Sequence, residues 1–475
     1  MSKTILSRRD ALKLFGAGAA GALLASCKGA PATPTITPAP THTAEVQLPT
    51  AQTLEGFKPL MSNPPEKVKL LYWWGNNYEP AMNFTHEIIK RFSLAYPNVE
   101  VEPVGGQNCD AFVTAAAAGT PPDLFHTWDC VERMGNWASR EMIIPLDNYI
   151  TASNLNMTDF VPGIMDTCKM DGKTWGLVDS AGVFLLWGRP QQFTEIGKTV
   201  NDVPKDSDEL WDWANKLTTK DADGNINRLG MVLPTWNWPR MSWQVNFGAE
   251  LWDTAKNEPT PDHPGSIAAL NDLVAQVNLR GVEALDKWST SIGSQGGEQN
   301  PWLAGNLTFQ VEGDWNGQQI FDFFPNWEFG KDYIAMAPPP PPASKQKGES
   351  AVAFWSWPWV IPSKTKTPDW SWELLRFFDS PEYQLNVHSK FKEIVVRKSM
   401  MADKREWWPA AKVALDIVNG GRKLTTIIPM IPVAGEYINL LSEAFDKVLH
   451  LTETPEEAMA RVKAETIKAM QEAQS

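Results

Sequence analysis

Between residues 68 and 125, apolar runs alternate with stretches whose apolar positions recur at helical spacing. Val68–Trp74 and Val99–Val104 are apolar enough for strands, and Leu124–Phe125 forms a shorter buried run. Between the first two predicted strands, one helical face is apolar and consists of Phe84, Ile88, Phe92 and Ala95. After the second predicted strand comes an alanine-rich stretch that ends at Gly119. This alternation predicts an α/β fold with a parallel sheet and helices on its faces.

The second half of the chain also contains stretches with apolar positions at helical spacing, but its sequence is not a repeat of the first half. Helical spacing recurs over residues 204–217, with a start at Ser207, and over residues 267–277 and 370–378. Near the C-terminus, Thr454 precedes an acidic first turn and can cap it. With 475 residues, of which 43% are hydrophobic, the chain can bury a large core and divide into two or three domains.

The N-terminus has the pattern of an export signal. A basic start is followed by an apolar run over residues 14–25 that ends at Cys27; the basic residues are Lys3, Arg8, Arg9 and Lys13. The run is shorter than the ~20 residues of a membrane-spanning helix, which disfavours a transmembrane anchor, and a cysteine at the cleavage point is what lipid attachment requires. We expect a lipoprotein signal at 1–26, with twin-arginine features at Ser7–Lys13, and acyl chains on Cys27. Residues 27–66, rich in Pro, Thr and Ala, form an extended spacer.

Charge and cysteine content narrow the possible partners. The formal net charge of -13 repels phosphate backbones and anionic lipid, so we expect no nucleic acid partner. The cysteines that remain beyond Cys27 are Cys109, Cys130 and Cys168. They cannot all pair and have no zinc-site spacing, so they are either buried thiols or include one bridge whose partners the sequence leaves open. We expect no cofactor and no metal.

Tryptophan is the unusual residue, with 23 copies against 7 tyrosines. Some indoles must belong to the core, whereas core packing does not explain the presence of tryptophans in loops. Trp74 ends the first strand, beside Asn76 and Glu79, and Trp128–Asp129 follows the third. Further tryptophans lie in loops or on an alternating strand: Trp238, Trp243, Trp315, Trp355, Trp357 and Trp359. Strand alternation assigns the last three mainly to the core, and helical positions assign Trp211, Trp370 and Trp372 to packing.

Several segments, in this order, resemble one family. They are the Trp73–Trp74 loop, Gly119-Thr120-Pro121-Pro122-Asp123-Leu124, Pro145-Leu146-Asp147, Ser207-Asp208-Glu209-Leu210-Trp211, Phe247–Asp253, Leu303 through Gly313-Asp314-Trp315, and Phe377–Glu382. From about Val68 to its end, the chain resembles bacterial extracellular solute-binding proteins of the maltose-binding type, the lipoprotein receptors of sugar-importing ABC transporters. It departs from the family pattern at Leu186–Arg189 and Asn306–Phe309.

The resemblance implies a two-lobed periplasmic-binding-protein fold of type II, with the ligand cleft at the hinge. Lobe 1 would comprise residues 67–180 with 335–380, and lobe 2 residues 181–334 with 381–475. It also implies a monomeric, non-enzymatic receptor that is lipid-anchored outside the cytoplasmic membrane and delivers a mono- or oligosaccharide to an ABC permease. Closure of the lobes around the ligand would be the signal that the permease reads.

A sugar has flat C–H faces that suit indole rings and a rim of hydroxyls that needs polar partners. The site residues we expect on this basis are Trp315, Trp74, Asp129, Trp128, Asp314, Asn76, Glu79, Trp238, Trp243 and Trp355. Of these, Trp315 rests most directly on the resemblance.

Two other functional classes stay open at this point. A surface-anchored glycan hydrolase would use the same aromatic platforms together with a pair of carboxylates, but no pair is marked in the sequence. A glycan-binding sensor or adhesion lipoprotein would bind without feeding a transporter. A possible calcium loop at Asp221–Asn227 lacks the glycine position and the bidentate glutamate, which favours a simple turn.

Overall fold

The computed structural model of this protein describes residues 54–473, apart from 77–78, 235–236, 293–296, 343–349, 392, 404–406 and 422. The expected signal peptide, Cys27 and residues 27–53 of the expected spacer lie outside the described residues. Within the rest of that spacer range, Phe57 is buried and its ring packs against Phe92 and Phe377, so this end of the range belongs to the folded body. In the part that is described, no helix combines the length and the apolar character that crossing a membrane requires.

The three strands expected near the N-terminus are confirmed. β1 (Val68–Trp74) pairs in parallel with β2 (Val99–Val104) on one side and β3 (Leu124–His126) on the other. The connecting helices are α2 (Glu79–Lys90), α3 (Phe92–Ala95) and α4 (Cys109–Ala118). The Asn108 side chain caps α4 by accepting a hydrogen bond from the Ala111 amide at 2.9 Å, and Gly119 ends it in the left-handed conformation.

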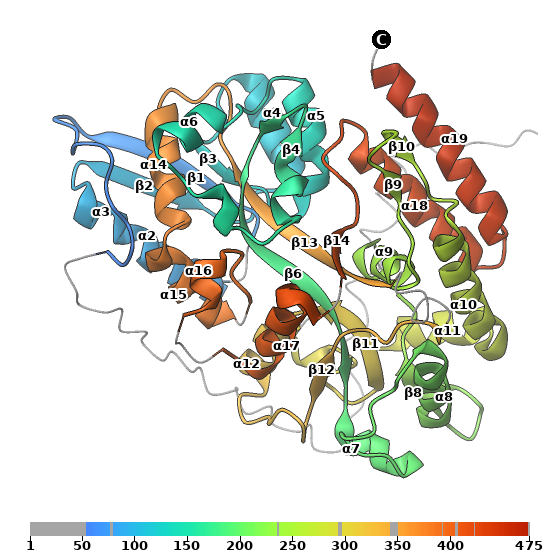
Figure 1. The fold of residues 1–475 in the computed structure, drawn as a ribbon. Coiled ribbons are helices and arrows are strands. Elements are labelled where there is room, and N and C mark those ends of the chain that lie inside the picture. Colours follow the sequence, from blue (N-terminus) through green and yellow to red (C-terminus); the bar gives the residue numbers. More distant parts are fainter. Residues whose placement is uncertain are drawn as a thin grey trace, which may run out of the picture. The chain divides into compact units, whose positions relative to one another are not determined.

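Two long antiparallel strands join this sheet to the rest of the chain (Figure 1). They are β6 (Leu177–Gly188) and β13 (Ala351–Val360), and every residue of both is buried. The strand order is β2-β1-β3-β13-β6-β11-β8-β7, where β11 is Leu307–Gly313, β8 is Ile226–Met231 and β7 is Thr219–Lys220. β12 (Ile334–Met336) also pairs with β6, and β14 (Lys423–Thr426) with β13. The α/β class is confirmed, with a mixed sheet because β6 runs antiparallel to β13, β11 and β12.

The helical elements that complete the described chain are η1 (Trp128–Arg133), α5 (Met134–Ser139), α6 (Asp147–Ala152), η2 (Met157–Asp159), η3 (Ile164–Cys168), α7 (Pro190–Phe193), η4 (Thr194–Ile196), α8 (Ser207–Leu217), α9 (Asn237–Asn246), α10 (Pro264–Arg280), α11 (Val282–Ser291), η5 (Gly297–Gln299), α12 (Asn316–Phe323), α14 (Pro368–Phe378), α15 (Pro381–Phe391), α16 (Lys398–Met401), α17 (Pro409–Asp416), η6 (Ile417–Gly421), α18 (Ala434–Leu449) and α19 (Pro455–Ala473). Two short ribbons pair β4 (Lys169–Met170) with β5 (Lys173–Thr174) and β9 (Trp252–Asp253) with β10 (Glu258–Pro259).

Several expectations about local structure are confirmed. α8 begins at Ser207, although Asp206 rather than Ser207 provides the cap by accepting from the Glu209 amide. Thr454 and Glu457 form reciprocal hydrogen bonds at the start of α19. Asp221 closes a turn by accepting from the amides of Asp223 and Asn225, as expected for a turn in place of a calcium loop.

Tryptophan rings fill much of the core. Trp211 and Trp372, which were assigned to packing, are buried, and Trp370 lies edge-on to Tyr96. Among the largest fully buried side chains are Trp137, Trp187, Trp213, Trp243, Trp302 and Trp359. Core packing therefore accounts for a large share of the high tryptophan count.

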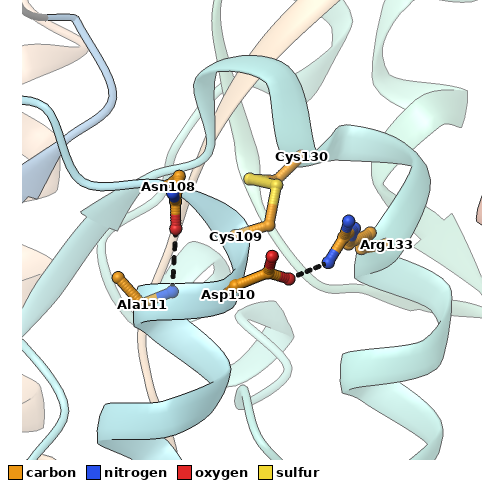
Figure 2. Close-up of a disulfide and its surroundings, with 6 residues drawn as sticks. All are labelled: Asn108, Cys109, Asp110, Ala111, Cys130 and Arg133. Atoms are coloured by element: carbon orange, nitrogen blue, oxygen red, sulfur yellow. Dashed lines mark hydrogen bonds and ion pairs between the residues drawn. A yellow bond between two sulfur atoms is a disulfide. The ribbon is translucent and has the colours of Figure 1, made fainter. Parts of the chain in front are cut away.

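A disulfide between Cys109 and Cys130 settles the alternative that the sequence left open (Figure 2). It joins the first residue of α4 to the middle of η1, with the two Cα atoms 5.7 Å apart. Beside it, Arg133 of η1 donates to the Asp110 carboxylate at 2.6 Å. Cys168 is a buried free thiol, and burial raises its pKa to about 12. The bridge and the ion pair together fix η1 against α4.

Candidate functional site

Trp315 lies over two glycines at the point where β6 meets β11. A Cβ atom at Gly182 or at Gly313 would occupy the space that the Trp315 ring fills. Phe184 and Trp357 contact the ring edge-on, with centroid distances of 5.5 and 5.6 Å. The indole of Trp315 is half-buried, so two glycines and two aromatic rings hold in place a side chain that keeps partial exposure.

Asp314, the neighbouring candidate, points into the interior. Its side chain is fully buried, and its Oδ1 accepts a hydrogen bond from the Val183 amide at 3.2 Å. Burial raises the pKa of Asp314 well above its ordinary value, and the charge of Glu393 adds to the shift. Asp314 therefore ties the end of β11 to β6 and does not offer its carboxyl group to a ligand in this structure.

Trp238 of α9 and Trp355 of β13 form a second aromatic group. Their ring centroids are 3.4 Å apart, and their exposed fractions are 8% and 7%. Both rings line a small inner pocket of about 20 Å³, together with Glu132 and Thr167. The structure thus brings together two predicted site residues that are more than a hundred positions apart in the sequence.

A larger groove of about 710 Å³ adjoins this inner pocket. The two cavities share Glu132, Trp238 and Ile438 as lining residues. The polar side chains of the groove come from η1, α5, α9, α18 and α19, and they are Glu132, Arg133, Asn136, Asn237, Glu436, Asn439 and Glu472. Its walls therefore combine an indole with carboxylates, amides and a guanidinium group, all of which can bond to hydroxyls.

The candidates at the end of β1 lie away from the cavities described above. Trp74 is 6% exposed and packs edge-on against His126. Asn76 is half-buried, and its carbonyl accepts from the Gly106 amide. Glu79 is exposed at the first residue of α2. None of the three lines the groove or the inner pocket.

Trp128 and Asp129 belong to η1, immediately before the bridged Cys130, and their side chains lie outside the described part of the structure. The same element carries Glu132 and Arg133, which line the groove. The backbone of Trp128 and Asp129 is thus continuous with one wall of the groove.

Trp243 has a packing role. It is 1% exposed, and its indole N–H donates to Asp272 Oδ2 at 3.1 Å, while Trp211 donates to the same atom at 2.8 Å. Burial raises the pKa of this shared carboxylate to about 6. Trp243 therefore holds α9 against α8 and α10.

The polar groove residues Glu132, Arg133, Asn136, Glu436 and Asn439 were missed in the sequence. Glu132 and Arg133 follow the predicted site residues Trp128 and Asp129 by a few positions, and this proximity is the weak indication in the sequence that they line the site. Glu436 and Asn439 lie on an ordinary amphipathic helix, and nothing in the local pattern distinguishes them from solvated residues. Trp357 was assigned to the core, and its edge-on contact with Trp315 also makes it a support for that ring.

No cluster of three metal-binding side chains is found among the described residues. The titratable groups of the groove are Glu132 and Arg133 of η1, Glu436 of α18 and Glu472 of α19. The arrangement is suited to holding a neutral, hydroxylated molecule by stacking and hydrogen bonds.

The fold of the chain is similar to that of several solved structures. A mannotriose-bound structure of CpMnBP1 has a TM-score of 0.73 and 21% identity, and the match covers 84% of this chain and all of that one. The ABC substrate-binding protein Lmo0181 from Listeria monocytogenes, in complex with cycloalternan, has a TM-score of 0.68 and 17% identity over 86% of this chain and 100% of the other. The sugar-binding protein MalE from Xanthomonas citri has a TM-score of 0.66 and 17% identity, over 86% and 98% of the two chains.

A search among proteins of curated function finds no match to the sequence. The family model described as "Bacterial extracellular solute-binding protein" matches residues 76–385, which is well over half of the chain. The matched span includes β6, β11 and β13, the strands that carry Gly182, Gly313 and Trp355. The chain therefore belongs to the bacterial extracellular solute-binding protein family.

Proposed function

We propose that this protein is a lipid-tethered receptor that captures a sugar or oligosaccharide in the groove beside Trp238 and delivers it to an ABC import permease. The observation that carries the proposal is the groove itself. Trp238 lines it together with Glu132, Asn136, Asn237 and Asn439, which come from distant parts of the chain.

The chemistry of the groove favours a carbohydrate over other solutes. The C–H face of a pyranose loses water readily against an indole, while each buried hydroxyl needs a donor or an acceptor. The groove offers carboxylate and amide oxygens as acceptors, and amide and guanidinium groups as donors. Two indole rings that stack on the sugar, together with a few polar contacts, are consistent with micromolar binding, which corresponds to a binding free energy of about 8 kcal/mol.

Trp315 would supply a second platform. Its ring lies on Gly182 of β6 and contacts Trp357 of β13, the strand that also carries Trp355. We propose that Trp128 and Asp129, on η1, also contribute to this site. Trp74, Asn76 and Glu79, at the end of β1, stay proposed ligand contacts although they do not line the groove or the inner pocket.

The two lobes are part of the same proposal. β6 and β13 would serve as the hinge strands, with lobe boundaries near residues 180 and 335. The third boundary, expected near residue 380, falls beyond α15 in this proposal, because Glu382 of α15 pairs with Arg91 beside α2 and Ser180 bridges to Val395. The inner pocket that Trp238 and Trp355 help to line would then widen or close as the lobes move.

The proposed ligand class agrees with the solved structures of the same fold, whose descriptions name mannotriose, cycloalternan, maltose and tagatose as bound ligands. Export, acylation of Cys27, a monomeric state and the absence of turnover complete the proposal.

The test is equilibrium dialysis of the purified protein against a panel of mono- and oligosaccharides, followed by chromatography of the sugar. We expect at least one sugar to be retained at micromolar concentration and recovered intact. Shortened products would show a hydrolase, and a panel without any retained sugar would contradict a carbohydrate receptor. Deletion of the gene in the source cell, with loss of uptake of the retained sugar, would separate a transport receptor from a sensor.

A further inference from the structure

Gly135 of α5 makes a close contact with the main chain of Ile431, in the segment that precedes α18. A Cβ atom at Gly135 would lie 2.1 Å from the carbonyl oxygen of Ile431 and 2.3 Å from its carbonyl carbon. Such atoms pack at about 3.5 Å or more, so a side chain here would require a shift of at least about 1 Å. Gly135 is buried and Ile431 is 8% exposed. The two backbones therefore approach each other to a distance that a side chain at position 135 would prevent.

Helix formation does not explain a glycine at this position. Gly135 is the second residue of α5 and does not have a positive φ, so its backbone conformation is open to any residue. Glycine is among the least favourable residues inside a helix, whereas alanine is the most favourable. The close approach of Ile431 is the structural feature that excludes alanine.

Both sides of this contact are anchored. The Ile431 carbonyl accepts a hydrogen bond from the Ala434 amide at 3.3 Å, at the start of α18. On the other side, α5 follows directly on η1, which the Cys109–Cys130 bridge joins to α4. Because neither backbone can turn away locally, a side chain at position 135 would move α18 relative to α5.

The contact lies beside the groove and between the two proposed lobes. Gly135 belongs to the proposed lobe 1 and Ile431 to the proposed lobe 2. The next residue along the chain lines the groove in each case, namely Asn136 on one side and Pro432 on the other. The spacing between Gly135 and Ile431 therefore helps to set the width of the groove.

We propose that Gly135 is a positioning residue for sugar capture, because the absence of a side chain there lets the two lobes close fully on the groove. The inference rests on the proposed function, since a receptor that closes around its ligand is what requires this approach. A side chain at position 135 holds the lobes apart. The apparent affinity then falls in proportion to the fraction of molecules that still reach the closed state.

The first test measures the distance between the lobes by double electron–electron resonance, with the sugar retained in dialysis at saturation. Spin labels are attached after Ala117→Cys and Ala464→Cys, at two exposed positions on α4 and α19. Cys168 is buried, and Cys27→Ser removes the other thiol outside the bridge. We expect Gly135→Ala to give a mean distance longer than that of the wild type by about 1 Å or more.

The same variant should bind the sugar about tenfold more weakly in a calorimetric titration, as when one molecule in ten reaches the closed state. Gly435→Ala is the matched control for the distance measurement. It adds the same methyl group on α18, where the atoms nearest to a Cβ are Glu132 Cγ and Arg133 Cγ at 3.8 Å. We expect this control to close to the wild-type distance.

Hydrogen exchange of the wild type tests the contact without a substitution, in case Gly135→Ala does not fold. We expect bound sugar to slow amide exchange in residues 134–139 and 427–433 together, and to leave α14 unchanged. If the wild type binds sugar but neither segment gains protection, or if Gly135→Ala closes and binds like the wild type, this inference is wrong and the receptor function stands. A wild type that retains no sugar would overturn the proposed function, and this inference with it.

Discussion

The indole of Trp315 occupies the space that a side chain at Gly182 would fill. A Cβ atom at Gly182 would lie 2.7 Å from Trp315 Cε3 and closer still to Cζ3. Since both residues lie where β6, β11 and β13 meet, the position of this ring is determined by a glycine on a hinge strand proposed above.

Gly182→Ala should therefore weaken sugar binding by displacing the Trp315 ring. We expect a loss of about tenfold, or 1.4 kcal/mol, by calorimetric titration. A double-mutant cycle gives the control: if displacement of the ring is the whole effect, Gly182→Ala causes no further loss in a Trp315→Ala background. Additive losses would show that Gly182 acts independently of Trp315.

The Cys109–Cys130 bridge should contribute to both stability and binding. The two residues are separated by 21 positions, and a loop of this length corresponds to a stabilisation of about 3 kcal/mol. We expect the double variant Cys109→Ser with Cys130→Ser to lose about that amount in urea unfolding, and to bind sugar more weakly because η1 forms a groove wall. Dithiothreitol should lower the stability of the wild type and leave the variant unchanged. Equal stability of the oxidised wild type and the variant would contradict a stabilising role of the Cys109–Cys130 disulfide.

A buried charged network beside β6 predicts a pH dependence of stability. Asp179 of β6 accepts from Gln384 at 2.8 Å, lies 3.0 Å from His126 and 3.4 Å from His388, and His388 lies 3.4 Å from Glu393. Burial lowers the pKa of His388, but Asp179 and Glu393 outweigh burial and raise it to about 9. His126 and His388 hold the pKa of Asp179 below its ordinary value despite burial.

The folded state therefore holds the His388 proton more tightly than the unfolded state. This contribution is fully present below pH 6.5 and is lost as the pH rises through about 9. We expect the free energy of unfolding to fall by 1–3 kcal/mol, an order-of-magnitude figure, between pH 6.5 and 9.5. Urea unfolding across this range measures it, and His388→Gln should flatten the slope. The same slope in the variant would show that another group is responsible.

The sequence was sufficient for the α/β class and for most elements around β1 to β3, because each strand there is a continuous apolar run bounded by turn residues. It was also sufficient for the starts of α8 and α19, where capping residues mark the boundary locally. Resemblance to a family added the place of Trp315, which no periodicity would reveal.

The sequence could not predict the groove, because its lining residues come from five separate parts of the chain: 113, 132–137, 237–238, 432–439 and 469–473. Glu436 and Asn439 acquire a role only when α18 is placed beside η1. Trp243, in contrast, was predicted to lie in a loop at the site because it stands in a proline-containing stretch. The structure places it on α9, where its indole N–H donates to Asp272. The burial of a side chain and its hydrogen-bond partners depend on tertiary packing, which the local sequence pattern does not show.

The most direct test of the account is a calorimetric titration of the sugar retained in dialysis against wild type and Trp315→Ala, with matched unfolding curves. We expect micromolar binding by the wild type, a loss of at least about tenfold in the variant, and little change in unfolding, since the ring is half-buried. Equal affinity of the two proteins for that sugar would contradict the claim that this indole is a platform of the binding site.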